Sequence, residues 1–119
     1  MHLDTAIQPR TEQIVRLAQL SMVSEREGDI HVLILTGEID LANAGDVEAE
    51  LRRIETTDVD VILVDLWGIS FIDSTGIKVL ISAAARSRET GRLLLERPSP
   101  AVMRVLRIAG VADLLPLAV

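Results

Sequence analysis

Four consecutive small residues, Asp73-Ser74-Thr75-Gly76, could place a reactive hydroxyl at the start of a helix. They follow a strand-like run over residues 59–66 and an apolar loop over residues 69–72, and a helix-like segment over residues 77–89 comes next. Backbone N–H groups and the dipole at a helix N-terminus favour negative charge. The fold could therefore carry a phosphate here, and we interpret Ser74 as a phosphorylation site rather than a catalytic residue.

A second polar segment, Gly37-Glu38-Ile39-Asp40, ends the preceding predicted strand. Because the carboxyl ends of neighbouring parallel strands meet at one edge of a sheet, we expect this segment to converge on Ser74. Asp, Ser and Thr are also the ordinary N-caps of helices, so Asp73-Ser74 taken alone indicates no more than a cap. The acidic segment at the same edge is what favours a functional site.

A hydrolase with Ser74 as nucleophile would need a histidine base oriented by a third group. The chain has only two histidines, His2 near the N-terminus and His31 at the start of a strand, which puts His31 at the opposite edge of the sheet. The Gly-x-Ser-x-Gly motif is also missing, since the local order is Ile-Asp-Ser-Thr-Gly. We therefore predict that the chain is not an enzyme.

Four carboxylates, those of Glu38, Asp40, Asp65 and Asp73, raise the question of a metal site. A strand-end carboxylate such as Asp65 beside Asp73 resembles the Mg²⁺ site of some α/β phosphotransfer domains. We prefer the alternative in which Asp65 accepts hydrogen bonds from backbone or caps a loop. The sequence thus predicts neither a metal nor another cofactor.

Six arginines fall on predicted helices, where we expect solvated faces or ion pairs along the helix surface: Arg52, Arg53, Arg86, Arg88, Arg104 and Arg107. Trp67 follows a predicted strand, and we expect it to pack rather than to anchor an interface.

The composition describes one domain of 119 residues with an aliphatic core, since 49% of residues are hydrophobic and only 2% aromatic. The net charge of −6 argues against nucleic acid, whose phosphates require basic surfaces. Cysteine is absent, which excludes disulfides and thiolate chemistry. With no secretory signal and no apolar run near the ~20 residues of a membrane span, we expect a cytoplasmic protein.

Apolar periodicity predicts alternating strands and helices. The expected strands cover residues 17–25, at the sheet edge, then 31–39, 59–66 and 93–95. The expected helices cover residues 44–54, 77–89 with Gly91 as C-cap, and 100–109 between Ser99 and Gly110, followed by a helical turn over 113–117. This order implies a mostly parallel mixed α/β sheet of four to five strands with about four helices.

The N-terminal segment is harder to assign. Residues 1–15 are polar and mixed, and we expect a tail or loosely attached extension preceding a domain over residues 16–119. A helix over residues 11–20 remains open, because Ile14, Leu17 and Ala18 also fit a helical spacing.

Four segments of the chain are distinctive in their order: Gly37-Glu38-Ile39-Asp40-Leu41, Val64-Asp65-Leu66, Phe71-Ile72-Asp73-Ser74-Thr75-Gly76 and Pro98-Ser99-Pro100-Ala101-Val102. In these four segments the chain resembles a STAS domain, in particular the bacterial anti-sigma factor antagonists. The order and spacing of the segments make the resemblance specific over residues 31–117.

The resemblance implies a regulatory cycle. The unphosphorylated protein binds a partner that is both anti-sigma factor and serine kinase, which frees the sigma factor. Phosphorylation of the serine after the aspartate, here Ser74 with Thr75 as runner-up, blocks this binding, and a phosphatase resets the cycle. We expect a monomer or weak dimer and a partner surface made by Glu38, Asp40, Asn43, Asp73, Ser74, Thr75, Gly76, Ile77 and Lys78.

The expected switch acts by exclusion. First-turn N–H groups would favour a phosphate on Ser74 while Asp73 would repel it, so the fold should barely change. Two alternatives are a STAS scaffold in a larger assembly and a small-ligand or lipid-linked STAS module whose hydroxyl binds rather than accepts phosphate.

Overall fold

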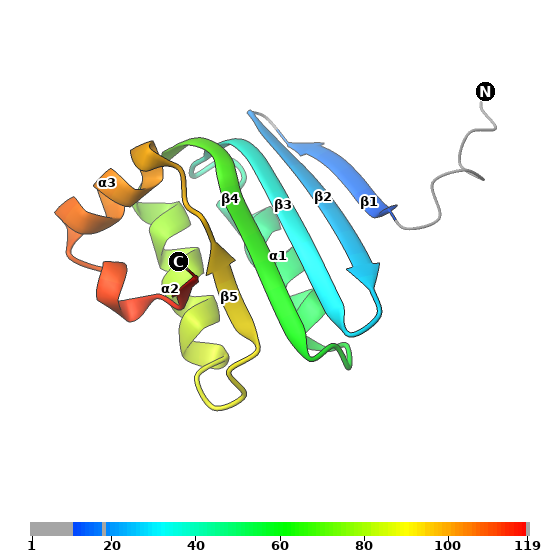
Figure 1. Cartoon of the computed structure of the whole chain (residues 1–119). Helices are drawn as coiled ribbons and strands as arrows, with labels where there is room; N and C mark the ends of the chain where they lie inside the picture. The colour runs from blue at the N-terminus through cyan, green and yellow to red at the C-terminus, as the bar shows by residue number, and fades with distance from the viewer. Residues whose placement is uncertain (1–10, 18, 119) are drawn as a thin grey trace, which may run out of the picture.

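The structure is a computed structural model that describes residues 11–17 and 19–118, of which residues 11–17 are described by their backbone only. Six strands form one mixed sheet in the order of the chain (Figure 1). The first two pairings are antiparallel and the other three are parallel. The strands are β1 Thr11–Leu17, β2 Leu20–Glu27, β3 Ile30–Ile39, β4 Val61–Ile72, β5 Leu93–Glu96 and β6 Leu117–Ala118.

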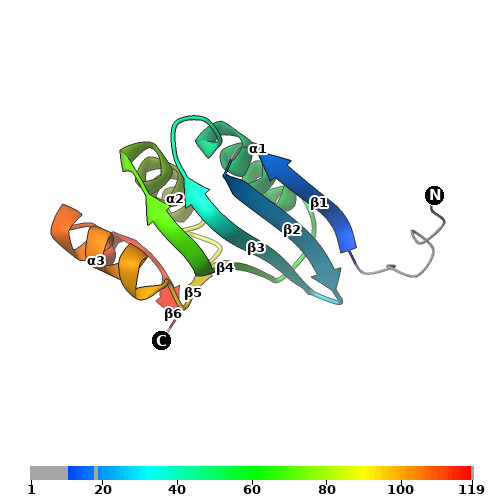
Figure 2. The same cartoon turned by 90° about the horizontal axis from the view of Figure 1, so that it is seen from above.

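Three α-helices cross between the parallel strands: α1 Ala44–Glu55, α2 Ser74–Arg86 and α3 Pro100–Ala109. A 3₁₀ turn, η2 Ala112–Leu114, precedes β6. Helices α1 and α2 lie side by side against one face of the sheet, while α3 lies at the β5–β6 end (Figure 2). The α/β class and the mostly parallel sheet are as predicted, with three α-helices and one 3₁₀ turn where about four helices were expected.

Alternate residues of the central strands build the core. In the first part of β3 and β4, up to Leu35 and Leu66, the buried side chains are spaced by two, as a pleated strand with one covered face requires. Beyond these residues the pairing contains bulges and the spacing widens to three or four. Burying these aliphatic side chains contributes roughly 1.5–3 kcal/mol each. The core members from the two strands are Leu33, Leu35, Ile39, Ile62, Val64, Leu66, Ile69 and Ile72.

The predicted caps of α3 are confirmed. The Oγ atom of Ser99 accepts a hydrogen bond from the N–H of Val102, and Pro100 occupies the first turn, where its missing N–H costs nothing. Gly110 ends the helix in the left-handed conformation, with φ of 73°.

The predicted N-terminal organisation is wrong in part. Residues 11–15, expected in a tail, belong to β1, and β1 also excludes the helix considered over residues 11–20. Strand β2 is therefore covered by β1 rather than lying at the edge. The rest of the predicted tail, residues 1–10, lies outside the described residues.

Three other boundaries differ from prediction. Strand β4 continues through residues 69–72, expected to be a loop, because it stays paired with β3 across two bulges. Helix α2 ends at Arg86, so Gly91 caps a turn rather than the helix. The expected helical turn over residues 113–117 is η2 followed by the short strand β6.

Two predictions about surface side chains need correction. Arg52 pairs with Glu48 one turn away, as expected, but Arg86 is half-buried and binds Glu48 and Glu55 of α1. Trp67 was expected to pack, yet 57% of its surface is exposed and its ring lies beneath the guanidinium of Arg97.

Candidate functional site

The two polar segments converge at the carboxyl ends of β3 and β4. The last residues of these strands, Ile39 and Ile72, are paired, and the N–H of Asp73 donates to the carbonyl of Ile39 over 3.1 Å. The N–H of Leu41 also hydrogen-bonds to the Asp73 carboxylate. The predicted meeting of the acidic loop with the serine loop is confirmed.

Asp73 is the N-cap of α2. Its Oδ1 atom accepts from the N–H groups of Thr75 and Gly76, at 2.9 and 3.2 Å, and from the Thr75 hydroxyl. The Thr75 hydroxyl has the largest effect on the pKa of Asp73; together with the backbone donors it lowers this pKa below its ordinary value of 3.8 against the opposing effect of burial. Asp73 is thus ionised and committed to internal hydrogen bonds at neutral pH.

Ser74 is the first residue of α2 and its side chain is exposed. Within the described residues no hydrogen bond engages its hydroxyl. The neighbouring Thr75 differs, because it is half-buried and its hydroxyl is used by Asp73. Of the two hydroxyl residues, Ser74 is therefore the exposed one, and its hydroxyl takes no part in the cap.

Gly76 and Ile77 fix the position of the helix start. A Cβ atom on Gly76 would lie 2.7 Å from Cγ1 of Ile72 and 2.8 Å from Cγ2 of Ile39, so only glycine lets α2 approach the strand ends. The Ile77 side chain points into the core and is 9% exposed. Both residues are buried, so they fix the position of Ser74 through packing and do not form part of the exposed surface around it.

The acidic loop is ordered by its own side chains. Asn43 is fully buried; its amide donates to the Glu38 carbonyl and its Oδ1 accepts from the N–H of Asp40. The Asp40 carboxylate accepts from the N–H of Ala42 over 2.9 Å. Asn43 holds the loop in place, whereas Glu38 and Asp40 are half-exposed.

Two exposed apolar side chains near Ser74 were not predicted as site residues. Leu41, in the acidic loop, is 79% exposed, and Phe71, near the end of β4, is 48% exposed. Lys78 lies one helical turn after Ser74 and is exposed, as a surface role requires. The sequence offers a signal for Leu41, because an apolar residue in a polar turn is unusual, but none for Phe71, which lies within the apolar end of β4.

The geometry gives no support to the catalytic and metal alternatives. His31 is buried near the opposite end of β3, where its ring hydrogen-bonds to the hydroxyl of Ser24. Asp65 accepts from the N–H of Trp67 over 3.0 Å, which confirms its preferred role as a backbone acceptor. No cluster of three metal-ligating side chains occurs within the described residues.

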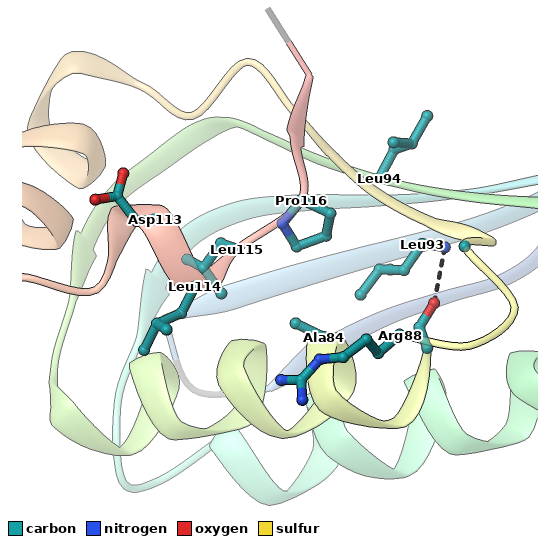
Figure 3. A pocket seen from close by; sticks show the side chains of 10 residues that line it. Ala84, Arg88, Leu93, Leu94, Asp113, Leu114, Leu115 and Pro116 are labelled. Carbon is teal, nitrogen blue, oxygen red and sulfur yellow. Dashed lines mark hydrogen bonds between the residues drawn. The ribbon is translucent and has the colours of Figure 1, made fainter.

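A hollow of about 310 Å³ lies at the other end of α2 (Figure 3). Ala84 of α2 and Arg88 of the turn that follows it face Leu93 of β5 and Leu115 across the hollow. Ser74 and the acidic loop contribute nothing to its lining, so this hollow is separate from the candidate site.

Comparison with known proteins gives the family. A model of the STAS domain matches residues 21–118. The anti-sigma-B factor antagonist of Listeria monocytogenes is 30% identical over 95 residues, covering 78% of this chain and 82% of that protein. The chain belongs to the STAS-domain anti-sigma factor antagonist family. Members of this family are non-enzymatic regulators, which confirms that the chain is not an enzyme.

Solved structures of STAS antagonists share the fold. An anti-sigma factor antagonist from Mycobacterium paratuberculosis superposes with a TM-score of 0.74 at 21% identity, covering 82% of this chain and 84% of that one. The unphosphorylated form of the antagonist SpoIIAA gives a TM-score of 0.62 at 26% identity, covering 82% and 88%. In the described part of this STAS chain, no helix is long and apolar enough to cross a membrane.

Proposed function

We propose that this protein is an anti-sigma factor antagonist switched by phosphorylation of Ser74. In its unphosphorylated form it binds an anti-sigma factor that is also a serine kinase, in the cytoplasm, and the sigma factor is released. The kinase then modifies Ser74 and a phosphatase restores the hydroxyl. The observation that carries this proposal is the exposed Ser74 side chain on the first residue of α2, beside an ordered acidic loop.

The docking surface of the proposal consists of Asp40, Leu41, Phe71, Ser74 and Lys78. Exposed apolar residues supply binding energy when a partner covers them, and a few central anchors usually dominate an interface. Leu41 and Phe71 would be these anchors, and the charged groups around them would orient the partner. Glu38 and Thr75 would lie at its margin, while Asn43, Asp73, Gly76 and Ile77 would hold the surface in shape.

Exclusion by charge is favoured over unfolding. The N–H groups of Thr75 and Gly76 already bind the Asp73 carboxylate, so a phosphate on Ser74 would find fewer free donors than a bare helix start offers. Lys78, one turn away, is the nearest cation along α2 and would partly offset the repulsion from Asp73. The free domain should therefore lose little stability.

In the complex the same phosphate would cost far more. A charge of about −1.5 to −2 would enter an interface built around a neutral hydroxyl. An uncompensated buried charge costs about 3 kcal/mol or more, which weakens affinity by over a hundredfold. One modification thus separates binding from folding.

The direct experiment incubates the purified chain and its Ser74→Ala variant with ATP and the serine kinase captured from the native host. We expect one phosphate on the wild type, mapped to Ser74 by mass spectrometry, and none on Ser74→Ala. The variant should still bind the kinase. Transfer to Thr75, or to neither hydroxyl, would overturn the proposal.

The apolar anchors can be tested separately. Replacing Leu41 with Ala should weaken partner binding about tenfold. The substitution removes most of a side chain that is exposed in the free domain and would be buried by the partner. Ile108 of α3 is equally exposed, at 78% against 79% for Leu41, and provides the matched control. If Ile108→Ala weakens binding as much as Leu41→Ala, the docking surface is misplaced.

A further inference from the structure

A shallow apolar groove of about 430 Å³ lies outside the docking surface. Three elements and a loop build it: Trp67 comes from β4, Met103 from α3, and Leu117 and Ala118 from β6, with Arg97 and Pro98 from the segment after β5. Its size falls in the range of small-ligand sites, which combine an apolar wall with few polar groups. A mostly apolar lining of this kind suits a hydrocarbon group.

Arg97 supplies the one charged side chain of the lining. Its guanidinium carbon lies 5.7 Å from the centroid of the Trp67 ring, in cation–π contact. No carboxylate pairs with Arg97 within the described residues, although the chain has 18 acidic residues. Among the described residues, the guanidinium of Arg97 is thus a positive charge at the groove without a carboxylate partner.

The backbone at Arg97 points to the same place. Its φ of 39° is in the left-handed region, and within the described residues no other non-glycine residue has a positive φ. Such a conformation costs about 1–3 kcal/mol and is found preferentially at ligand sites. In this chain the residue with this conformation is also the one whose guanidinium lies over Trp67 in the groove lining.

We infer that the groove binds a small amphipathic carboxylate, such as a medium-chain fatty acid. The carboxylate would pair with Arg97, and the hydrocarbon would lie against Trp67, Met103 and Leu117. A single guanidinium with no second cation in the lining suits a monoanion better than a phosphate-rich ligand. This inference does not depend on the proposed function, because none of the groove residues belongs to the docking surface.

Trp67 makes the test direct. It is the chain's only tryptophan and there is no tyrosine, so intrinsic fluorescence reports on the groove. The protein is titrated with decanoate and with decanol below their aggregation limits. We expect a saturable change with decanoate, and affinity for decanol about fivefold lower because it lacks the charge.

Variants assign the charge to Arg97. Arg97→Gln should weaken decanoate binding about fivefold and leave decanol unchanged, whereas Arg97→Lys should stay close to wild type. Arg107→Gln, exposed on α3 and outside the lining, is the control and should bind like wild type. Circular dichroism checks that each variant is folded.

Three results would overturn the inference: no saturable change with decanoate, equal affinity for decanoate and decanol, or unaltered decanoate binding by folded Arg97→Gln. Should Arg97→Gln not fold, the test passes to Arg97→Lys: a folded Arg97→Lys that still prefers decanoate to decanol supports the inference, and a folded Arg97→Lys that prefers decanol contradicts it.

Discussion

The two ends of α2 differ in whether their polar side chains are paired within the domain. At the C-terminal end, Arg86 donates to Glu48 and Glu55 of α1 over 2.8 and 2.7 Å, and all three side chains are mostly buried. At the N-terminal end, Ser74 and Lys78 are exposed, and no ion pair or hydrogen bond between described residues engages either side chain. One end of the helix is fixed by the domain itself, and the other leaves its polar groups available.

A second arginine strengthens the fixed end. The guanidinium of Arg92 donates to the backbone carbonyls of Glu55, Thr57 and Val59, over 2.7, 3.1 and 2.9 Å, and thereby holds the connection between α1 and β4. Polar groups whose hydrogen-bonding capacity is satisfied internally serve the fold. Those left unsatisfied at the surface are the candidates for recognition.

The largest expected effect is on partner binding at the open end. Ser74→Asp should lower affinity for the anti-sigma partner by about a hundredfold, or ~3 kcal/mol, because a carboxylate enters an interface suited to a hydroxyl. Its melting temperature should stay within about 2 °C of wild type.

Ser82, exposed two turns further along α2, supplies the control for charge alone. Titration calorimetry on Ser82→Asp should give an affinity within about twofold of wild type. Equal loss in the two variants would mean that net charge, and not the position of Ser74, governs binding.

Gly76 tests how the open end is positioned. Gly76→Ala should lower the free energy of unfolding by about 2 kcal/mol, because its Cβ would press on Ile39 and Ile72. In α1, Gly45 has open space where a Cβ would lie, so Gly45→Ala should stabilise by about 0.5–1 kcal/mol. Urea denaturation measures both, and effects of the same sign would contradict the close packing inferred at Gly76.

At the fixed end, Arg86→Ala should lower the free energy of unfolding by about 1–2 kcal/mol. The loss is less than for a fully buried pair, since Glu48 and Glu55 keep some contact with solvent. Partner affinity should not change. Arg88 is exposed and lies two residues after Arg86. Arg88→Ala should lower the free energy of unfolding by less than about 0.5 kcal/mol, and thermal melts measure both variants. A drop in affinity for Arg86→Ala with unaltered stability would reverse the assignment of the two ends.

The smallest expected effect concerns pH. The pKa of Asp73 is lowered in the folded state, so its ionised form stabilises the domain above its ordinary value of 3.8, and this contribution is lost as pH falls through the folded-state pKa. Asn is also a good N-cap but does not titrate. Wild type should therefore exceed Asp73→Asn in melting temperature near neutral pH, and the difference in melting temperature should narrow progressively as the pH falls below 3.8. If the difference in melting temperature widens on acidification, the pKa of Asp73 is not lowered in the folded state.

Periodicity predicted most of the fold because buried strands and amphipathic helices leave regular patterns. It failed for β1, whose mixed sequence does not alternate clearly between polar and apolar residues and whose pairing with β2 no local pattern reports. It also missed the end of β4, where pairing with β3 continues across bulges. Helix α2 starts at Ser74, three residues before its first apolar periodic position, since the Asp73 cap sets the start.

For the site, residue types were predictable and exposure was not. The convergence of Asp40 and Asp73 followed from strand order alone. Whether Asn43 faces the loop interior or solvent depends on tertiary packing, and so does the exposure of Leu41 and Phe71. Ile77 could have been recognised as a core residue from the sequence. It is the fourth residue after the Asp73 cap and the first of the apolar residues that recur along the buried face of α2.

On the proposed mechanism, a phosphate on Ser74 blocks docking while the fold stays intact. To test this, stoichiometrically phosphorylated protein is titrated against its anti-sigma partner, and its melting temperature is recorded beside that of the unmodified chain. We expect the affinity to fall by over a hundredfold with the melting temperature almost unchanged. Unreduced affinity, or a phosphorylated domain that has lost its cooperative unfolding transition, would contradict it.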